Sequence, residues 1–360
     1  MPKGFCAVEL ILNKLITDPA GKILANSRLR AVSRRMGFNE AARGRIQTAC
    51  SEMTSNQLKH ASGVGLIQAW ESRGRAKHLD LFALDYGPGI MDTTLAARDG
   101  YSTSGTLGKG IGGIRRMADM CEVYSIPESD ARSATWHGTA VWARFTPETR
   151  LSNPADDDIR TGCFLRAMGD DIHNGDWIHY TLFGYGKVSW IHLDGLGHGR
   201  AAAEAVEMAG GIIDPGLPLN RTMELIDAAL KGGRGAVGLA AEFDAEERVL
   251  RYCGVGDLRI CHVKDATLKT LVLGRGILGH AHGTFKAHEV YIGDKQVVFS
   301  ASDGIRAAWN KGDLPGLWRL HPQMIAFLLG NVMARENDDR SLFVLQLPDN
   351  KTEEDSHDYE

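Results

Sequence analysis

Two β-rich runs, WIHYTLF and KVSWIHL, flank the short turn GYG and constrain the fold of this chain more than any other feature. This pattern is typical of a β-hairpin. Folding the chain about Tyr185 places residues 176 and 194 opposite one another. Asp176 begins the first strand and Asp194 ends the second, so two carboxylates meet at one end of a sheet, where like charges repel unless a cation joins them. The pattern therefore predicts a divalent-metal site at the open end of the hairpin.

Other acidic residues of the same half also stand at strand ends. Asp303 follows the apolar run VVFSAS, and the pair Asp338 and Asp339 precedes SLFVLQL. Gly195, directly after Asp194, exposes its carbonyl as a neutral oxygen ligand. An all-oxygen set spread over several strands favours magnesium or manganese over zinc, and it differs from a calcium loop, whose ligands cluster within about a dozen residues. Because an Asp-Gly pair after a strand is commonly only a turn, the prediction depends on these positions occurring together.

The motifs NGDWIHY, HLDGLGHG, RGAVGLAAEFD, RYCGVGDLRI, SASDGI and NDDRS occur in this order, with helical patterns at 200–211 and 220–232. In these motifs the C-terminal half resembles the metal-dependent type 2C (PPM) serine/threonine protein phosphatases in their compact bacterial SpoIIE-type form, especially the stressosome feedback phosphatases. The resemblance covers about Asp171 to Leu347. It implies an α-β-β-α sandwich that holds two Mn²⁺ or Mg²⁺ ions.

The same resemblance assigns the acidic positions. Asp194 would bridge both ions, and Asp176 would bind metal directly or through water and take part in catalysis. The implied ligands are Asp176, Asp194, Gly195, Asp303, Asp338 and Asp339. Asp339 can exchange roles with Asp338, and His198 is either a proton donor to the leaving group or a turn histidine.

Three features of the N-terminal half describe a nucleotide site. Glu52 and Asn56 lie four residues apart in a helical stretch, so a carboxylate and an amide share one face. The apolar run LDLFALD ends in DYGPGI, where Asp85 can accept from an exocyclic amine while Gly87 and Gly89 let backbone approach a flat ring. The third feature is the loop STSGTLGKGIGGIRR, whose glycines and hydroxyls lead into a helix and suit phosphates.

Two common nucleotide motifs do not explain this loop. Gly108, Gly110 and Gly113 formally match the dinucleotide fingerprint, but they follow a polar loop rather than a strand, and no strand with a terminal acidic residue appears about twenty positions later. A P-loop is excluded because Lys109 is followed by glycine, where Ser or Thr would be needed to hold magnesium. We therefore expect an ATP cradle of another kind.

The stretch DYGPGIMDTTLAARDGYSTSGTLGKGIGGIRRMAD and the run HGTAVWAR resemble the GHKL-type (Bergerat) ATPases, and within them the serine switch kinases of the bacterial stressosome and the related anti-sigma-factor kinases. The likeness spans about Leu10 to Arg144 and implies an α/β sandwich that binds ATP with Mg²⁺. Glu52 would activate the substrate hydroxyl, and Asn56 would help to hold magnesium. The implied cofactor-binding residues are Asn56, Asp85, Gly87, Gly89, Gly108, Gly110, Gly112 and Thr139.

One departure leaves alternatives open. Many relatives have alanine after the asparagine, where this chain has Gln57. The N-terminal half is therefore interpreted either as an active serine kinase or as a catalytically silent ATP-binding and docking module that gates the phosphatase. A scaffold with both sites degenerate fits poorly, because every expected metal aspartate is present.

Length and composition set the organisation. A chain of 360 residues is long for one core, so a two-domain α/β protein is expected. The stretch TPETRLSNPADDD is polar and proline-containing, as linkers are. We expect an ATP-binding domain at 1–146, a linker at 147–160, a phosphatase domain at 161–348 and an acidic tail at 349–360.

The formal charge of -4 and the pI near 6.4 argue against nucleic acid as a partner. The N-terminal run resembles neither a signal peptide nor a membrane span, and six scattered cysteines fit reduced cytoplasmic thiols. We therefore expect a cytoplasmic protein with no membrane partner. By resemblance, its partners are STAS-domain anti-sigma antagonists or stressosome scaffold proteins bearing phosphoserine or phosphothreonine, and a homodimer is one expected assembly.

Overall fold

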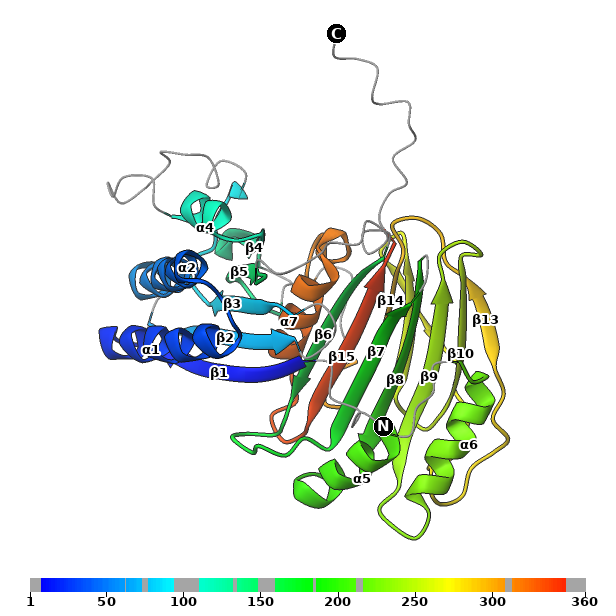
Figure 1. Cartoon of the computed structure of the whole chain (residues 1–360). Coiled ribbons are helices and arrows are strands. Elements are labelled where there is room, and N and C mark those ends of the chain that lie inside the picture. The colour runs from blue at the N-terminus through cyan, green and yellow to red at the C-terminus, as the bar shows by residue number, and fades with distance from the viewer. Residues whose placement is uncertain are drawn as a thin grey trace. The chain divides into compact units, whose positions relative to one another are not determined.

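The computed structural model describes residues 8–61, 63–72, 77–93, 110–131, 135–147, 159–183, 186–211, 216–307 and 313–347. Its contacts divide the chain into two compact units (Figure 1). The N-terminal unit comprises Ala7–Leu151 and Ala308–Leu320, and the C-terminal unit comprises Met1–Cys6, Ser152–Ala307 and His321–Glu360. Most of the predicted linker and all of the predicted acidic tail lie outside the described residues.

The N-terminal unit is built on one antiparallel sheet of five strands in the order β1-β2-β3-β5-β4. The strands are β1 (Val8–Ile16), β2 (Gly65–Ser72), β3 (Leu79–Asp85), β4 (Met120–Ile126) and β5 (Gly138–Phe145). The helices are α1 (Pro19–Arg35), α2 (Glu40–His60) and α4 (Ile111–Met117), with short 3₁₀ turns η1 (Glu128–Asp130) and η3 (Leu317–Arg319).

Capping side chains and an apolar face explain the two long helices. Asp18 accepts a hydrogen bond from the Gly21 amide at 2.8 Å to begin α1, and Asn39 accepts one from Ala42 at 2.8 Å to begin α2. Helices α1, α2 and α4 and strands β1, β2, β3 and β5 share one buried core, which includes Leu29, Ile46, Met53, Ile67, Leu81 and Val141. The predicted helix and the predicted strand that ends at Asp85 are both confirmed.

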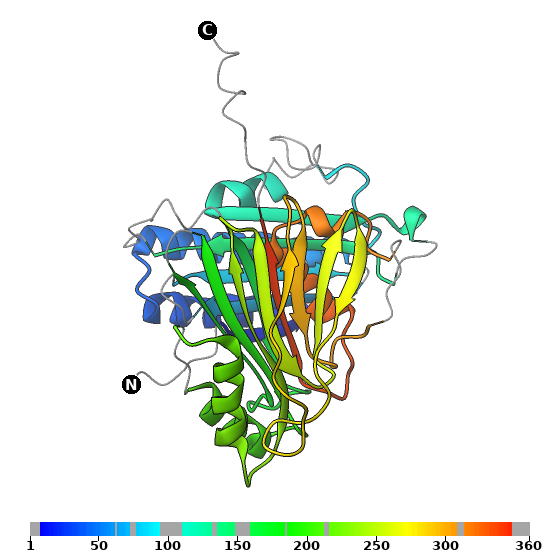
Figure 2. The ribbon, with the colours of Figure 1, turned by 90° about the vertical axis from the view of Figure 1, so that its right-hand side faces the viewer.

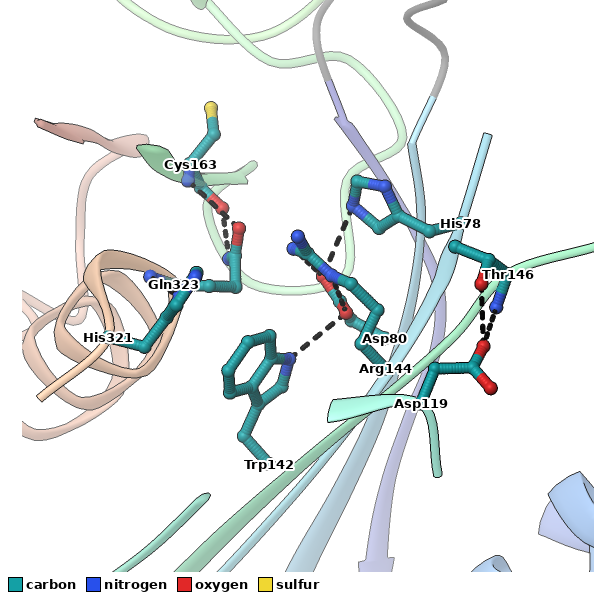
Figure 3. Close-up of polar contacts among 9 residues, drawn as sticks. All are labelled: His78, Asp80, Asp119, Trp142, Arg144, Thr146, Cys163, His321 and Gln323. Atoms are coloured by element: carbon teal, nitrogen blue, oxygen red, sulfur yellow. Dashed lines mark hydrogen bonds and ion pairs between the residues drawn. The ribbon is translucent and has the colours of Figure 1, made fainter. Parts of the chain in front are cut away.

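The opposite side of β3 carries an ion pair (Figure 3). Asp80 is 1% exposed and accepts from Arg144 through both oxygens, each at 2.8 Å. Trp142 donates its indole N–H to the same carboxylate at 3.0 Å, and His78 lies 3.4 Å away. Burial alone would raise the pKa of Asp80, but Arg144 and His78 hold it well below its usual range.

The C-terminal unit contains two antiparallel sheets of five strands each. One has the order β13-β10-β9-β8-β7, and the other has the order β12-β11-β14-β15-β6. The strands of the first sheet are β7 (Asp176–Phe183), β8 (Lys187–Gly195), β9 (Ala236–Asp244), β10 (Val249–Val255) and β13 (His288–Tyr291). Those of the second are β6 (Arg160–Arg166), β11 (Arg259–Lys264), β12 (Thr267–Leu271), β14 (Val297–Ala301) and β15 (Arg340–Gln346).

The two sheets pack face to face, and helices cover both outer sides (Figures 1 and 2). Between the sheets, the rings of Trp190 and Tyr180 lie 5.0 and 5.1 Å from that of Phe343. Helices α5 (Arg200–Gly210) and α6 (Leu219–Leu230) pack on the first sheet, and α7 (Pro322–Val332) packs on β6 and β15 of the second. These layers confirm the expected α-β-β-α sandwich.

A side chain of helix α7 makes hydrogen bonds to the backbone of the edge strand β6 beside it (Figure 3). Gln323 accepts from the Cys163 amide at 3.2 Å and donates to the Cys163 carbonyl at 2.8 Å, so one side chain takes the place of a neighbouring strand. His321 caps the helix by accepting from the Gln323 amide at 3.1 Å. Among the described residues, none of the helices combines the length and apolar character needed to cross a bilayer.

Candidate functional site

The hairpin of β7 and β8 has the register that the sequence predicts. Asp176 pairs directly with Asp194, and the pairing continues to Phe183 and Lys187 at the turn. Asp176 is 2% exposed, and Asp194, the residue before Gly195 at the end of β8 away from the turn, is half-buried. The two carboxylates therefore meet at the open end of the hairpin.

The second sheet brings two more carboxylates to this end of the sandwich. Asp303 follows β14 and Asp338 precedes β15, and the two strands are direct neighbours. Gly304 allows their loops to touch, because a Cβ at this position would lie 1.8 Å from the Asp339 carbonyl oxygen. Arg335, half exposed, lies with Nη1 3.8 Å from Oδ2 of Asp303 at the rim.

Neighbouring carboxylates raise the pKa values of the acids in this cluster. Burial first, then the carboxylates of Asp176, Asp303, Asp338 and Asp257, raise the pKa of Asp194. Burial and then Asp338 raise the pKa of Asp303. Repulsion of this kind costs free energy that a bound cation removes.

Asp257 is a member of this cluster that the sequence interpretation missed. It lies in the exposed turn between β10 and β11, and its charge acts on both Asp194 and Asp303. Its signal was present, because GVGD repeats the pattern of an apolar strand followed by an acid that drew attention to Asp303.

The contacts of Asp338 and Asp339 indicate different roles for the two carboxylates. Asp339 is buried, and its two oxygens accept from the amides of Met168 and Gly175, each at 2.7 Å. It therefore holds the chain that leads into β7. Asp338 is the member of the pair whose carboxylate interacts with Asp303.

The donor set fits a hard divalent cation. Every acid that faces the cluster is an aspartate, and carboxylate oxygens are the ligands that Mg²⁺ and Mn²⁺ prefer. Within the part of the chain that the structure describes, no three His, Cys, Asp or Glu side chains already converge closely enough to hold an ion. The fit therefore rests on the chemistry of the donors and on their mutual repulsion.

Gly195 is the last residue of β8, and His198 lies in the loop that follows. The Gly195 amide donates to the Gly175 carbonyl at 2.9 Å, which joins this loop to the segment before β7. His198 is exposed in the turn just before α5. The structure thus brings Asp176, Asp194, Gly195, Asp303 and Asp338 to the same end of the sandwich.

A second site lies at the end of β3 in the N-terminal unit. Oδ1 of Asp85 accepts from the amides of Gly87 at 2.9 Å and Thr139 at 3.0 Å. Burial raises the pKa of Asp85, and these two amides oppose that rise. Gly138, with φ of +131°, brings β5 close enough that a Cβ there would lie 2.2 Å from the Asp85 carbonyl oxygen. Both of these bonds fall on Oδ1, so, as far as the described residues show, Oδ2 is available to a ligand.

Three residues that the sequence interpretation did not assign build the frame of this turn. Trp136 donates its indole N–H to the Asp85 carbonyl at 3.0 Å. His137 contacts the Gly87 carbonyl at 2.9 Å, and Ser125 accepts from the Ile90 amide at 2.8 Å. Gly89, with φ of +74°, completes the turn.

Helix α2 carries the remaining polar pair. Glu52 and Asn56 are both half-buried, four residues apart on one face of the helix. Gln57 points elsewhere: it is 4% exposed and donates to the carbonyls of Leu66 at 2.7 Å and Leu84 at 3.2 Å. The departure at Gln57 is therefore a packing contact between α2 and the sheet.

The glycine loop is only partly described. Gly110 precedes α4 and Gly112 is buried within it, whereas Gly108 lies outside the described residues. Helices on one face of the sheet, together with the Asp85 turn at its end, define a GHKL-type domain, as the resemblance implies.

A search of curated relatives supports this class. The serine/threonine-protein kinase RsbT of Bacillus subtilis is 39% identical over 98 residues, which cover 27% of this chain and 73% of RsbT. The chain therefore belongs, through its N-terminal part, to the RsbT family of serine/threonine kinases. No family model matches the chain.

Solved structures resemble the chain at lower identity. RsbX in complex with magnesium is 18% identical, covers 53% of this chain and 96% of its own, and superposes with a TM-score of 0.46. A SpoIIE fragment from Bacillus subtilis with its PP2C phosphatase domain is 17% identical, covers 92% of this chain and 96% of its own, and has a TM-score of 0.45.

Proposed function

We propose that this chain is a partner-switching regulator whose C-terminal unit removes phosphate from phosphoserine or phosphothreonine. The observation that carries the proposal is the in-register pair of Asp176 and Asp194, faced by Asp303 and Asp338 from the second sheet. The substrates we propose are STAS-type anti-sigma antagonists or stressosome scaffold proteins in the cytoplasm.

Residues of the sandwich would supply the ligands of a two-metal site. Asp194 would be a ligand of both Mn²⁺ or Mg²⁺ ions, and Gly195 would contribute its carbonyl oxygen. Asp303 and Asp338 would complete the ligands of one ion. Asp176 would bind metal directly or through water. When bound, the ions would acidify a water molecule and neutralise the phosphate. In the hydrolysis, a water oxygen would form the new bond to phosphorus and lose a proton, while the bond to the serine or threonine oxygen would break and that oxygen would take up a proton. His198, exposed in the turn before α5, is the residue that we propose to supply this proton.

We also propose that the N-terminal unit is the opposing kinase. Oδ2 of Asp85 would accept from the amine of adenine, with Gly87, Gly89 and Thr139 framing the ring. Asn56 would help to hold Mg²⁺, and Gly108, Gly110 and Gly112 would close on the phosphates. Glu52 would take the proton of the attacking serine hydroxyl as the γ-phosphoryl group leaves ATP. Joining both activities in one chain gives each a high local concentration at a shared partner.

The phosphatase is tested directly with the full chain. We expect phosphate release from a phosphoserine STAS protein, and more slowly from a small aryl phosphate, that requires Mn²⁺ and stops when a chelator is added. Metal binding without turnover of either substrate would reject the phosphatase and leave the fold unaffected.

The kinase is tested by Glu52→Gln, which keeps the shape of the side chain. We expect transfer from ATP to an unphosphorylated STAS protein to fall by about 100- to 10,000-fold, the range that a general base contributes. ATP affinity should stay unchanged, because Glu52 would act on the substrate hydroxyl. If the unmodified chain binds ATP and transfers nothing, the silent docking module that gates the phosphatase is the correct interpretation.

A further inference from the structure

A path of buried polar side chains runs between the two sheets behind the aspartate cluster. Trp190, His192 and Asp194 alternate along β8 and so point to the same face, toward the second sheet. Trp190 and His192 are 1% and 0% exposed. Opposite them, Ser300 on β14 and Ser341 on β15 are both 0% exposed. Polar groups in such a place must satisfy one another.

The distances join these groups into one continuous path. Trp190 Nε1 lies 3.2 Å from Ser300 Oγ, which lies 2.9 Å from His192 Nδ1. On its other side, His192 Nε2 lies 2.6 Å from Ser341 Oγ. Ser341 Oγ in turn donates to Oδ2 of Asp176 at 2.7 Å. The path therefore ends on a proposed metal ligand.

Counting donors and acceptors fixes the direction of every bond. The single hydroxyl proton of Ser341 goes to the carboxylate of Asp176, so Ser341 Oγ must accept from His192, which carries its proton on Nε2. His192 Nδ1 is then an acceptor, and the Ser300 hydroxyl donates its hydrogen bond to it. Ser300 accepts in turn from the indole of Trp190, which can only donate. With a neutral imidazole, every member of the path is satisfied and no alternative direction exists for an ionised Asp176.

These hydrogen bonds fix the position of the Asp176 carboxylate between the two sheets. Ser341 is further fixed because its amide donates to Ser302 Oγ at 3.0 Å, and the Ser302 side chain also bonds to the Asp176 carboxylate. A carboxylate has about four acceptor positions, so two hydroxyls leave room for a cation.

We infer that Ser341, oriented by His192, is a positioning residue that holds the Asp176 carboxylate in its ion-binding orientation. The inference rests on the metal site of the proposed function and assigns roles to two residues outside the ligand set. Partners that orient metal ligands typically change metal affinity about 10- to 100-fold when they are removed.

The test compares two variants of one shape. Ser341→Thr keeps the hydroxyl, and Ser341→Val replaces it with a methyl group. We expect Mn²⁺ affinity, measured by calorimetry on the full chain, to fall about 10- to 100-fold in Ser341→Val and to stay near the unmodified value in Ser341→Thr. Both add similar bulk, so the melting temperatures of the metal-free variants show any shared packing effect.

The outcomes separate this inference from the function it rests on. Equal Mn²⁺ affinity in the Thr and Val variants overturns the role of the hydroxyl, whether or not the unmodified chain is a phosphatase. Failure of the unmodified chain to bind Mn²⁺ removes the metal site and the inference together. Unmodified binding without phosphate release rejects the phosphatase alone, and the Thr and Val comparison still decides the positioning role.

Discussion

Asp194→Asn is expected to lower Mn²⁺-dependent phosphate release by more than about 100-fold, because even partners outside the ligand set typically cost about 10- to 100-fold. Asp194 is the acid on which all others act: Asp176, Asp303, Asp338 and Asp257 each raise its pKa. An amide has the same shape but no negative charge, so it cannot bridge two cations. The measurement is the rate of phosphate release from a phosphoserine STAS protein at saturating Mn²⁺.

The same substitution should have the opposite effect on the metal-free chain. Replacing the central carboxylate removes like-charge repulsion, so the melting temperature without metal should stay equal or rise. A variant that is inactive because it unfolds would instead melt earlier. The matched control is Asp171→Asn, an exposed acid near the same loops whose carboxylate accepts from the amide of its neighbour His173 at 2.9 Å. Control and unmodified chain should release phosphate at similar rates, and full activity of Asp194→Asn would refute the bridging role.

The hairpin could be predicted from sequence because its geometry is local. Two strands joined by a short turn have one register that pairs Asp176 with Asp194, and the side-chain period of two fixes their face. Gly87 and Gly89 were informative for a different reason, close backbone approach. A Cβ on Gly87 would lie 2.3 Å from the His60 carbonyl oxygen, and one on Gly89 would lie 2.4 Å from that of Ile126.

The path behind the cluster could not be predicted in the same way. His192 and Ser341 are 149 residues apart, and nothing in either motif shows that their strands face each other. The sequence likewise left Asp338 and Asp339 interchangeable, because adjacent acids can be told apart only by what each one contacts. Helix α7 was not predicted at all, since the unbroken apolar run MIAFLL is compatible with a buried strand or a buried helix.

Arg144→Met is expected to destabilise the N-terminal unit by about 3–5 kcal/mol, the usual cost of removing one partner of a buried ion pair. Asp80, 1% exposed, would keep its charge and lose the two bonds that offset its burial. Amide hydrogen exchange of β3 measures the effect locally, and its protected amides should exchange about 100-fold faster or more. Arg35→Met removes a surface pair with Glu71 and should cost under about 1 kcal/mol.

The dependence of this stabilisation on pH has a definite sign. In the folded chain Arg144 and His78 hold the pKa of Asp80 below its usual range, so as pH falls the unfolded chain takes up a proton first. The contribution of the pair is therefore complete above the ordinary aspartate pKa of about 4 and is lost as pH falls toward the folded value. Unmodified chain and Arg144→Met should differ most in β3 exchange near neutral pH and converge under acid. A difference that is the same at both pH values would mean that Arg144 acts through its packing on Trp142, over which it lies at 5.1 Å, rather than through its charge.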